Sequence, residues 1–361
     1  MLREKLQVFH VILLTYMLQT GVVLFSLPRL VEENLGPNGW IGLLAVFLIA
    51  IANAWLIALV FQRGKGKSVF EILESVSKWL AYPIYVYLIL VWAFLGCLVD
   101  AQFVFIFQMI SFPTTSPWVF KVTILMLVVL YVHTKAYSMV KAASMLFFLS
   151  IWTLVVLVFP MQEFDWGRTE PLLFHSNIAN VEGVLEVYPA FLGFELILLL
   201  FPLMYKKFRL FQALVLGNLF SLFVYMATTI VSLGFFGSQY IGEIMFPVLD
   251  LIGYVRLPFV ERAEALIFSF FIGKVVVTVG FYYWAAKEAL ERIYKPRRPT
   301  WLVVFLIIGT YIPVRMLDTF HQIQEHLALV ALHATVISFG LPILLLIILS
   351  FKKPGRSVQK G

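Results

Sequence analysis

Three ionisable side chains lie deep inside long apolar segments of the chain. Glu195 lies in the run Phe191–Leu198, and Asp100 and Lys274 lie in two other apolar runs. A charge in hydrocarbon must be neutralised, paired or exposed to water in a cavity. Glu195 is therefore either a proton-titrating or ligand-facing group, or a neutral carboxyl that bonds backbone groups at a helix break. Asp100 and Lys274 are expected at similar depths, where they form either a functional coupling pair or a structural ion pair.

Two apolar segments are interrupted by glycine. Leu18–Pro28 contains Gly21, and Tyr188–Glu195 contains Gly193. A membrane helix that breaks at mid-depth bares N–H and C=O groups that lipid cannot satisfy. Matched breaks in two halves of a chain are therefore typical of transporter binding sites. The alternative is that each glycine only allows two helices to pack closely.

The two breaks predict complementary ends of one ligand site. If the helix unwinds at Gly21, the N–H groups of Gly21, Val22 and Val23 would begin a new half-helix, whose positive dipole end suits a carboxylate. The Thr20 hydroxyl would add a further contact. Carbonyl groups freed around Gly193 would hold an ammonium. The site would then clamp both charged groups of an α-amino acid. The predicted ligand-binding residues are Thr20, Gly21, Val22, Phe191, Gly193, Phe194 and Glu195.

The composition excludes a soluble globular protein. Hydrophobic residues make up 61% of the 361 residues, charged residues only 13%, and mean hydropathy is +0.94. Soluble domains carry about 25% charged residues. Apolar stretches long enough to cross a bilayer predict an all-α integral membrane protein of about ten transmembrane helices. The predicted spans are 8–30, 40–62, 82–111, 118–134, 140–160, 184–205, 210–233, 258–285, 300–314 and 328–351, with a short amphipathic cytoplasmic helix over 70–80.

The distribution of charge predicts the topology. Lys and Arg gather at one set of span ends, and acidic residues occupy most of the opposite loops. Because excess Lys and Arg marks the cytoplasmic side, both termini are predicted to be cytoplasmic. The net charge of +7 is thus a topology signal rather than a sign of nucleic-acid binding.

The spans divide into two related halves. The third and eighth spans are both longer than a bilayer requires, and each is the third helix of a five-helix half. An odd number of spans per half inverts the second half relative to the first. The prediction is one membrane domain over 1–361, with inverted five-helix repeats at about 8–160 and 184–351 and with helices 1 and 6 broken.

Catalytic and metal-binding patterns are absent from the sequence. Cys97 is the only cysteine, so no disulfide framework or cysteine-based metal site can form within one chain. No zinc-hydrolase, serine-hydrolase or phosphate-loop motif occurs, since Gly66-Lys67-Ser68 lacks the upstream glycine spacing. The sequence therefore predicts a protein that is not an enzyme and has no cofactor or metal.

Three stretches, taken together, give the chain a family resemblance. They are Gly21 with Leu27-Pro28 and Gly39-Trp40-Ile41, then Phe191–Glu195 with Phe201-Pro202, and Val260–Ala265. With ten predicted spans, the whole chain resembles the B subunit of GerA-type spore germinant receptors. This endospore germination permease family belongs to the amino acid–polyamine–organocation transporter superfamily.

The resemblance implies a receptor subunit of the spore inner membrane that senses a nutrient germinant, often an amino acid. In such families the unwound first and sixth helices hold the ligand, and a larger A subunit and a lipoprotein C subunit are the partners. The fifth span lacks the central Lys of some proton-coupled amino acid transporters, because Lys141 lies at its cytoplasmic edge. Two other functions stay open: an autonomous proton-coupled amino acid transporter acting through Glu195, and a structural subunit without ligand binding.

Overall fold

The computed structural model describes residues 5–36, 39–168, 181–205, 207–255, 263–296, 300–317 and 319–351, and all regular structure within these ranges is helical. Six helices are long and apolar enough to cross a membrane. Two pairs of consecutive helices, each bent at a short break, pass the same test as pairs, and two further apolar helices are shorter. These features give the all-α membrane fold that the composition predicted.

The first half of the chain contains α1 (Val8–Gln19), α2 (Val23–Leu35), α3 (Gly39–Gly64), α4 (Val69–Glu74), α5 (Lys78–Ser111), α6 (Pro117–His133) and α7 (Ala136–Ser150), which continues as a 3₁₀ helix over Ile151–Glu163. The second half contains α8 (Val181–Val187), 3₁₀ helices over Tyr188–Phe191 and Phe194–Leu203, α9 (Leu210–Phe236), α10 (Ser238–Ile241), α11 (Pro247–Tyr254), α12 (Ala263–Ile293), α13 (Thr300–Val314) and α14 (Phe320–Phe351).

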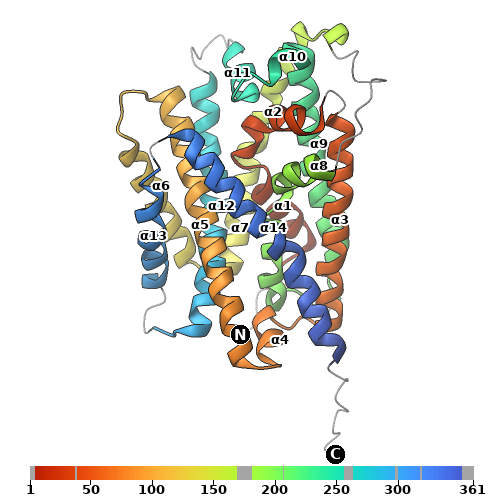
Figure 1. Ribbon diagram of the computed structural model, residues 1–361, viewed down its shortest axis with the longest axis vertical. Coiled ribbons are helices and arrows are strands. Elements are labelled where there is room, and N and C mark those ends of the chain that lie inside the picture. The colour runs from red at the N-terminus through yellow and green to blue at the C-terminus, as the bar shows by residue number, and fades with distance from the viewer. Residues whose placement is uncertain are drawn as a thin grey trace, which may run out of the picture.

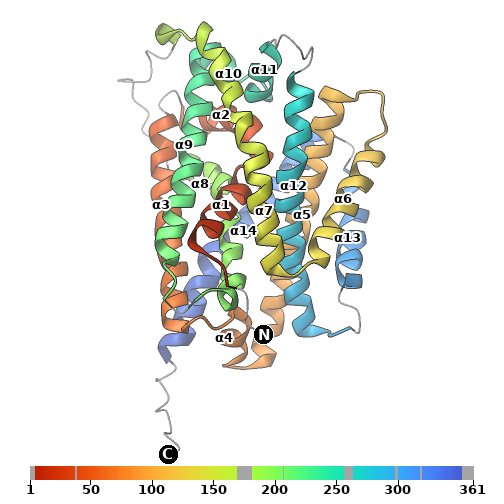
Figure 2. The same ribbon diagram turned by 180° about the vertical axis from the view of Figure 1, so that it is seen from behind.

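The long helices α5 and α12 pack side by side near the middle of the bundle (Figures 1 and 2). On one side they are flanked by α6 and α13, and on the other side α3 packs against α9. The short helices α1, α2 and α8 lie between these two groups (Figure 1). The broken segments are therefore surrounded by full-length helices, which keep their bare backbone groups away from lipid.

Both breaks lie at the predicted glycines. The axes of α1 and α2 differ by 66° across the break at residues 20–22. Residues 181–191 and 194–203 form the second bent pair, with an angle of 42°, and Gly193 lies between them. The chain thus bends in the first and the sixth of the predicted spans.

Two predicted elements differ in extent. The amphipathic helix expected over 70–80 is the shorter α4, which ends at Glu74, and Lys78 already begins α5. Ser68 starts α4 because its hydroxyl accepts the Glu71 N–H while the Glu71 carboxylate accepts the Ser68 N–H. The start of the eighth predicted span, including Val260–Arg262 of the family pattern, lies outside the described residues.

Candidate functional site

The first break leaves backbone donors without acceptors. The Gly21 N–H donates to the Gln19 carbonyl oxygen at 2.8 Å, so that donor is used within the turn. The N–H groups of Val22 and Val23 make no hydrogen bond with any described residue. They stand at the start of α2, where the helix dipole is positive. This end of α2 is therefore suited to an anionic group.

Carbonyl groups at the end of α1 are, by contrast, bonded to side chains of neighbouring helices. The Lys274 ammonium of α12 lies 3.4 Å from the Thr20 carbonyl oxygen, and the Thr278 hydroxyl donates to the Met17 carbonyl oxygen at 3.3 Å. The Tyr225 hydroxyl of α9 lies 2.8 Å from the Gln19 carbonyl oxygen. The C-terminal end of α1 is thus satisfied by protein donors.

The second break is largely closed by protein contacts, although the Leu192 carbonyl oxygen has no partner among the described residues. Gly193 has φ of +109°, and a Cβ at this position would lie 2.9 Å from the Leu18 Cβ. The backbone conformation and the close approach to α1 both require glycine. The Phe191 carbonyl oxygen accepts from Gln19 Nε2 at 2.7 Å, and the Ala190 carbonyl oxygen lies 2.7 Å from the Tyr225 hydroxyl. At Gly193, the close-packing alternative is therefore supported.

Glu195 is part of this closed break. Its side chain is 2% exposed, and its Oε2 accepts the Gly193 N–H at 2.6 Å. Its Oε1 has no hydrogen-bond partner among the described residues. The geometry matches the alternative in which the carboxyl group bonds backbone freed at the break.

Lys274 contacts the first break rather than Asp100. Its ammonium lies 3.2 Å from the Tyr16 hydroxyl and 3.3 Å from the Thr20 hydroxyl, and it lies over the rings of Tyr16 and Phe271. Asp100 and Lys274 do not form an ion pair in the structure, although both are fully described and buried. Lys274 thus joins α12 to the break through hydroxyl, carbonyl and aromatic groups.

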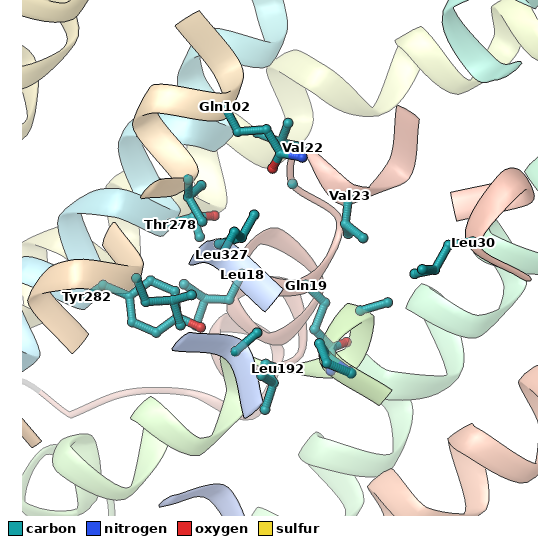
Figure 3. Close-up of a pocket in the computed structure, with 16 residues that line it drawn as sticks. Leu18, Gln19, Val22, Val23, Leu30, Gln102, Leu192, Thr278, Tyr282 and Leu327 are labelled. Carbon is teal, nitrogen blue, oxygen red and sulfur yellow. The ribbon is translucent and has the colours of Figure 1, made fainter. Parts of the chain in front are cut away.

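A cavity of about 130 Å³ lies against the first break (Figure 3). For scale, a cavity of about 150 Å³ accommodates a ligand the size of benzene. Gly21, Val22 and Val23 line it from the first break, and Pro189, Ala190 and Leu192 line it from the second. The remaining lining residues are Leu18, Gln19, Leu30, Leu95, Val99, Gln102, Thr278, Tyr282, Leu327 and Ala331. None of these residues carries a charge, so the cavity is suited to a small ligand without net charge.

Two polar side chains in the cavity wall have no protein partner. Gln102 of α5 is 6% exposed and Tyr282 of α12 is 3% exposed, and neither side chain makes a hydrogen bond with the described residues. Gly96 lets α5 approach α12 at this level, because a Cβ at Gly96 would lie 3.3 Å from the Tyr282 Cβ. The packing of two long helices therefore fixes where these unpaired groups stand.

A comparison with family models places the chain. The model for the spore germination protein family matches residues 5–323. The chain belongs to this family. The family resemblance predicted from the broken segments is thereby confirmed.

Curated members of this family match over most of their own length. The chain is 25% identical to spore germination protein GerQB of Bacillus cereus over 310 residues, which covers 84% of this chain and 85% of that protein. It is also 25% identical to spore germination protein YndE of Bacillus subtilis (strain 168) over 357 residues, or 96% of each chain. Spore germination protein A2 of the same strain matches at 25% identity, with 85% and 86% covered. Together with the apolar helices, this membership identifies an integral membrane protein of spore germination.

The predicted ligand-binding residues of this spore germination protein fall into two groups: those at the cavity and those away from it. Gly21 and Val22 line the cavity, whereas Thr20 adjoins it and binds Lys274. The predicted residues of the second break, which are Phe191, Gly193, Phe194 and Glu195, are buried but do not line the cavity. The second break contributes Pro189, Ala190 and Leu192 to the wall instead.

Sequence reasoning missed the polar side chains that organise the site. Gln19 donates through Nε2 to the Phe191 carbonyl oxygen and to Asn218 Oδ1 at 2.8 Å, so it joins the two breaks. Gln102 and Tyr282, together with Gln19 Oε1, supply unpaired side-chain polar groups of the lining residues. A signal was present, since Gln19 and Gln102 are amide side chains within otherwise apolar spans. Such side chains need partners at membrane depth.

Proposed function

We propose that this chain is the permease-like, germinant-sensing subunit of a spore germination receptor and that it binds a small amino acid beside the first helix break. The observation that carries the proposal is the pair of unpaired N–H groups, of Val22 and Val23, at the edge of a small, mainly apolar cavity. A carboxylate is the group that such a helix start binds best. The apolar wall would surround an aliphatic side chain.

The proposed membrane organisation follows the predicted spans. Six helices are long and apolar enough to cross a membrane, and the two bent pairs raise the number to eight. With the two shorter apolar helices they would make ten spans, arranged as two inverted five-helix repeats in a single domain. The long helices α5 and α12 hold matching third positions in the two halves, which supports the repeat. The chain would lie in the spore inner membrane with both termini cytoplasmic, and would assemble with the A and C subunits of the receptor.

Ligand binding would signal by favouring one arrangement of the bundle. A ligand shifts a conformational equilibrium only by its difference in affinity between the two states. The first break is bonded to α9 through Tyr225 and to α12 through Lys274 and Thr278. A ligand that fixes the start of α2 would therefore act on both helices at once.

Thermal stabilisation of the purified full chain by a panel of amino acids, sugars and nucleosides tests this proposal. A ligand at 100 times its Kd stabilises the folded state by about 2.7 kcal/mol. The Gly21→Val variant should abolish the shift, because a Cβ at Gly21 meets only the Thr278 hydroxyl oxygen, at 3.8 Å, and further methyl groups would enter the cavity. Gly340→Val is the matched control, because a Cβ at Gly340 meets nothing within 4 Å and the residue does not line the cavity. Absence of any stabilising compound would support a structural subunit instead.

Proton-coupled amino acid transport is the second candidate function, and the buried Glu195 carboxyl with its unpartnered Oε1 favours it. Sustained amino acid uptake by the isolated chain in liposomes, driven by a pH gradient, would establish this function. Glu195→Gln should then abolish uptake while leaving ligand binding intact. A chain that binds an amino acid but shows no uptake is a sensor.

A further inference from the structure

Gln102 and Tyr282 are polar side chains of the cavity wall that make no hydrogen bond with any described residue. Their polar atoms are not enclosed by protein and remain accessible from the cavity, where a ligand or water can bond them. Polar groups deep inside a folded protein are usually bonded to protein, to water or to a ligand. Their position in a cavity bounded by two helix breaks makes a ligand the natural partner.

Two of the carbonyl groups that the sequence suggested for an ammonium at the second break are already bonded to protein donors. The Phe191 carbonyl oxygen is bonded to Gln19, and the Ala190 carbonyl oxygen lies 2.7 Å from the Tyr225 hydroxyl. An ammonium group at either of these oxygens would have to displace a protein donor, whereas the Leu192 carbonyl oxygen has no partner among the described residues. The Gln102 amide oxygen and the Tyr282 hydroxyl oxygen are side-chain acceptors that need no such displacement, and Gln19 Oε1 is a further unpartnered acceptor of a lining residue.

We propose that Gln102 and Tyr282 bind the ammonium group of the amino acid whose carboxylate is held at Val22 and Val23. This inference rests on the proposed function and names a specificity-determining pair for it. The two side chains come from α5 and α12, the helices that pack together at Gly96. Figure 3 shows Gln102 near Val22, and Thr278 and Tyr282 together on another side of the cavity.

The chemistry of the wall explains why a zwitterion is selected. No lining residue is charged, so a ligand with a net charge would be buried without a counter-charge at high cost. In a zwitterionic amino acid the carboxylate and the ammonium compensate each other, and neutral dipoles suffice to orient them. A site built to bond an N–H group rejects an analogue that lacks it, because the site's polar groups are then left unpaired.

Matched pairs of amino acids and their deaminated analogues test the inference. The probes are L-alanine with propionate, L-valine with isovalerate and L-leucine with isocaproate, and dissociation constants are measured on the purified full chain. Wild type should prefer the amino acid in at least one pair. In Gln102→Leu and in Tyr282→Phe this preference should fall about tenfold, the effect of losing one hydrogen bond of about 1.4 kcal/mol. Affinity for the deaminated analogue should change less than about threefold, which shows that the cavity is intact.

Two control variants change residues of the same types on the same two helices. Tyr283→Phe changes the adjacent residue, whose hydroxyl lies 2.9 Å from the Thr310 hydroxyl and is outside the cavity. Gln108→Leu changes an amide further along α5 that donates to the Thr115 carbonyl oxygen. Both should retain the wild-type preference.

The outcomes separate the two proposals. If wild type binds amino acids but neither variant changes the preference for them, Gln102 and Tyr282 do not hold the ammonium and the inference is wrong. If wild type binds none of the amino acids, the proposed function fails, and the inference fails with it. If the variants weaken both members of a pair equally, the two side chains only shape the cavity, and the inference is again overturned.

Discussion

The two helix breaks look alike in sequence but differ in what their backbone groups bond. At the first break, the N–H groups of Val22 and Val23 have no acceptor among the described residues. At the second break, the Gly193 N–H bonds Glu195, and the carbonyl groups of Ala190 and Phe191 bond side chains. The first break thus leaves two N–H groups for a ligand. At the second break most groups bond within the protein, but the Leu192 carbonyl oxygen and the Phe194 N–H have no partner among the described residues. A glycine-interrupted span alone does not distinguish these two roles.

The difference arises from the side chains that reach each break. Donors are plentiful around the breaks, since Gln19, Tyr225 and Lys274 all donate to carbonyl groups there. An acceptor side chain is supplied only at the second break, by Glu195. No described side chain accepts from Val22 or Val23. The unsatisfied backbone groups of the first break are therefore donors, and the partner they lack is an acceptor such as a carboxylate. The unpartnered side-chain atoms at the two breaks, Gln19 Oε1 and Glu195 Oε1, are acceptors.

Gly193→Ala should have the largest effect on stability. The left-handed conformation costs a residue with a Cβ about 1–2 kcal/mol, and overpacking a dense contact costs about 1–3 kcal/mol more. The Cβ would lie 2.9 Å from the Leu18 Cβ and 3.2 Å from the Leu18 carbonyl oxygen. We expect a loss of about 2–5 kcal/mol, the sum of these two costs, measured as a lowered midpoint of thermal unfolding.

Gly340→Ala is the control for that change, since a Cβ there meets nothing within 4 Å. Equal stability of the two alanine variants would mean that the second break is not a closed contact. The contrast between the breaks would then be lost.

Gln19→Leu should have the next largest effect, because it removes the link between the breaks. The Phe191 carbonyl oxygen would lose its Gln19 donor, and Asn218 Oδ1 would lose its contact with Gln19 Nε2. Burying one unsatisfied polar group costs about 1–3 kcal/mol. Gln62→Leu, at an exposed position on α3, should change stability by less than about 0.5 kcal/mol. A stable Gln19→Leu variant would show that water replaces the amide and that the second break is more open than its contacts indicate.

Sequence reasoning predicted the elements well and the contacts poorly. Apolar runs and the glycines at 21 and 193 sufficed for the spans and the breaks, because span length and backbone freedom are local properties. The predicted ammonium site at the second break depended on carbonyl groups staying free. Whether they stay free depends on Gln19 and Tyr225, which reach the break from other spans. The amide of Gln19 in an apolar span indicates that it needs a partner, but no local pattern says which group it bonds. The same holds for Lys274, which contacts Thr20 rather than Asp100.

Gly21→Ala should have the smallest effect on folding and a clear effect on ligand binding. Gly21 lies outside the left-handed region, unlike Gly193, and an added Cβ would meet only the Thr278 hydroxyl oxygen, at 3.8 Å. Stability should therefore stay within about 0.5 kcal/mol of wild type. The added methyl group would nevertheless stand in the cavity wall beside the unpaired N–H groups.

Binding measurements on both alanine variants distinguish the loss of cavity space at Gly21 from the backbone strain and close packing at Gly193. We expect Gly21→Ala to unfold like wild type yet to bind an amino acid about tenfold more weakly, the effect of losing about 1.4 kcal/mol of binding, and Gly193→Ala to lose stability first. If Gly21→Ala instead destabilised the chain strongly, the first break would be packed as tightly as the second. Its glycine would then serve helix packing rather than access for a ligand, and the unpaired N–H groups of Val22 and Val23 would need a water molecule rather than a germinant as their partner.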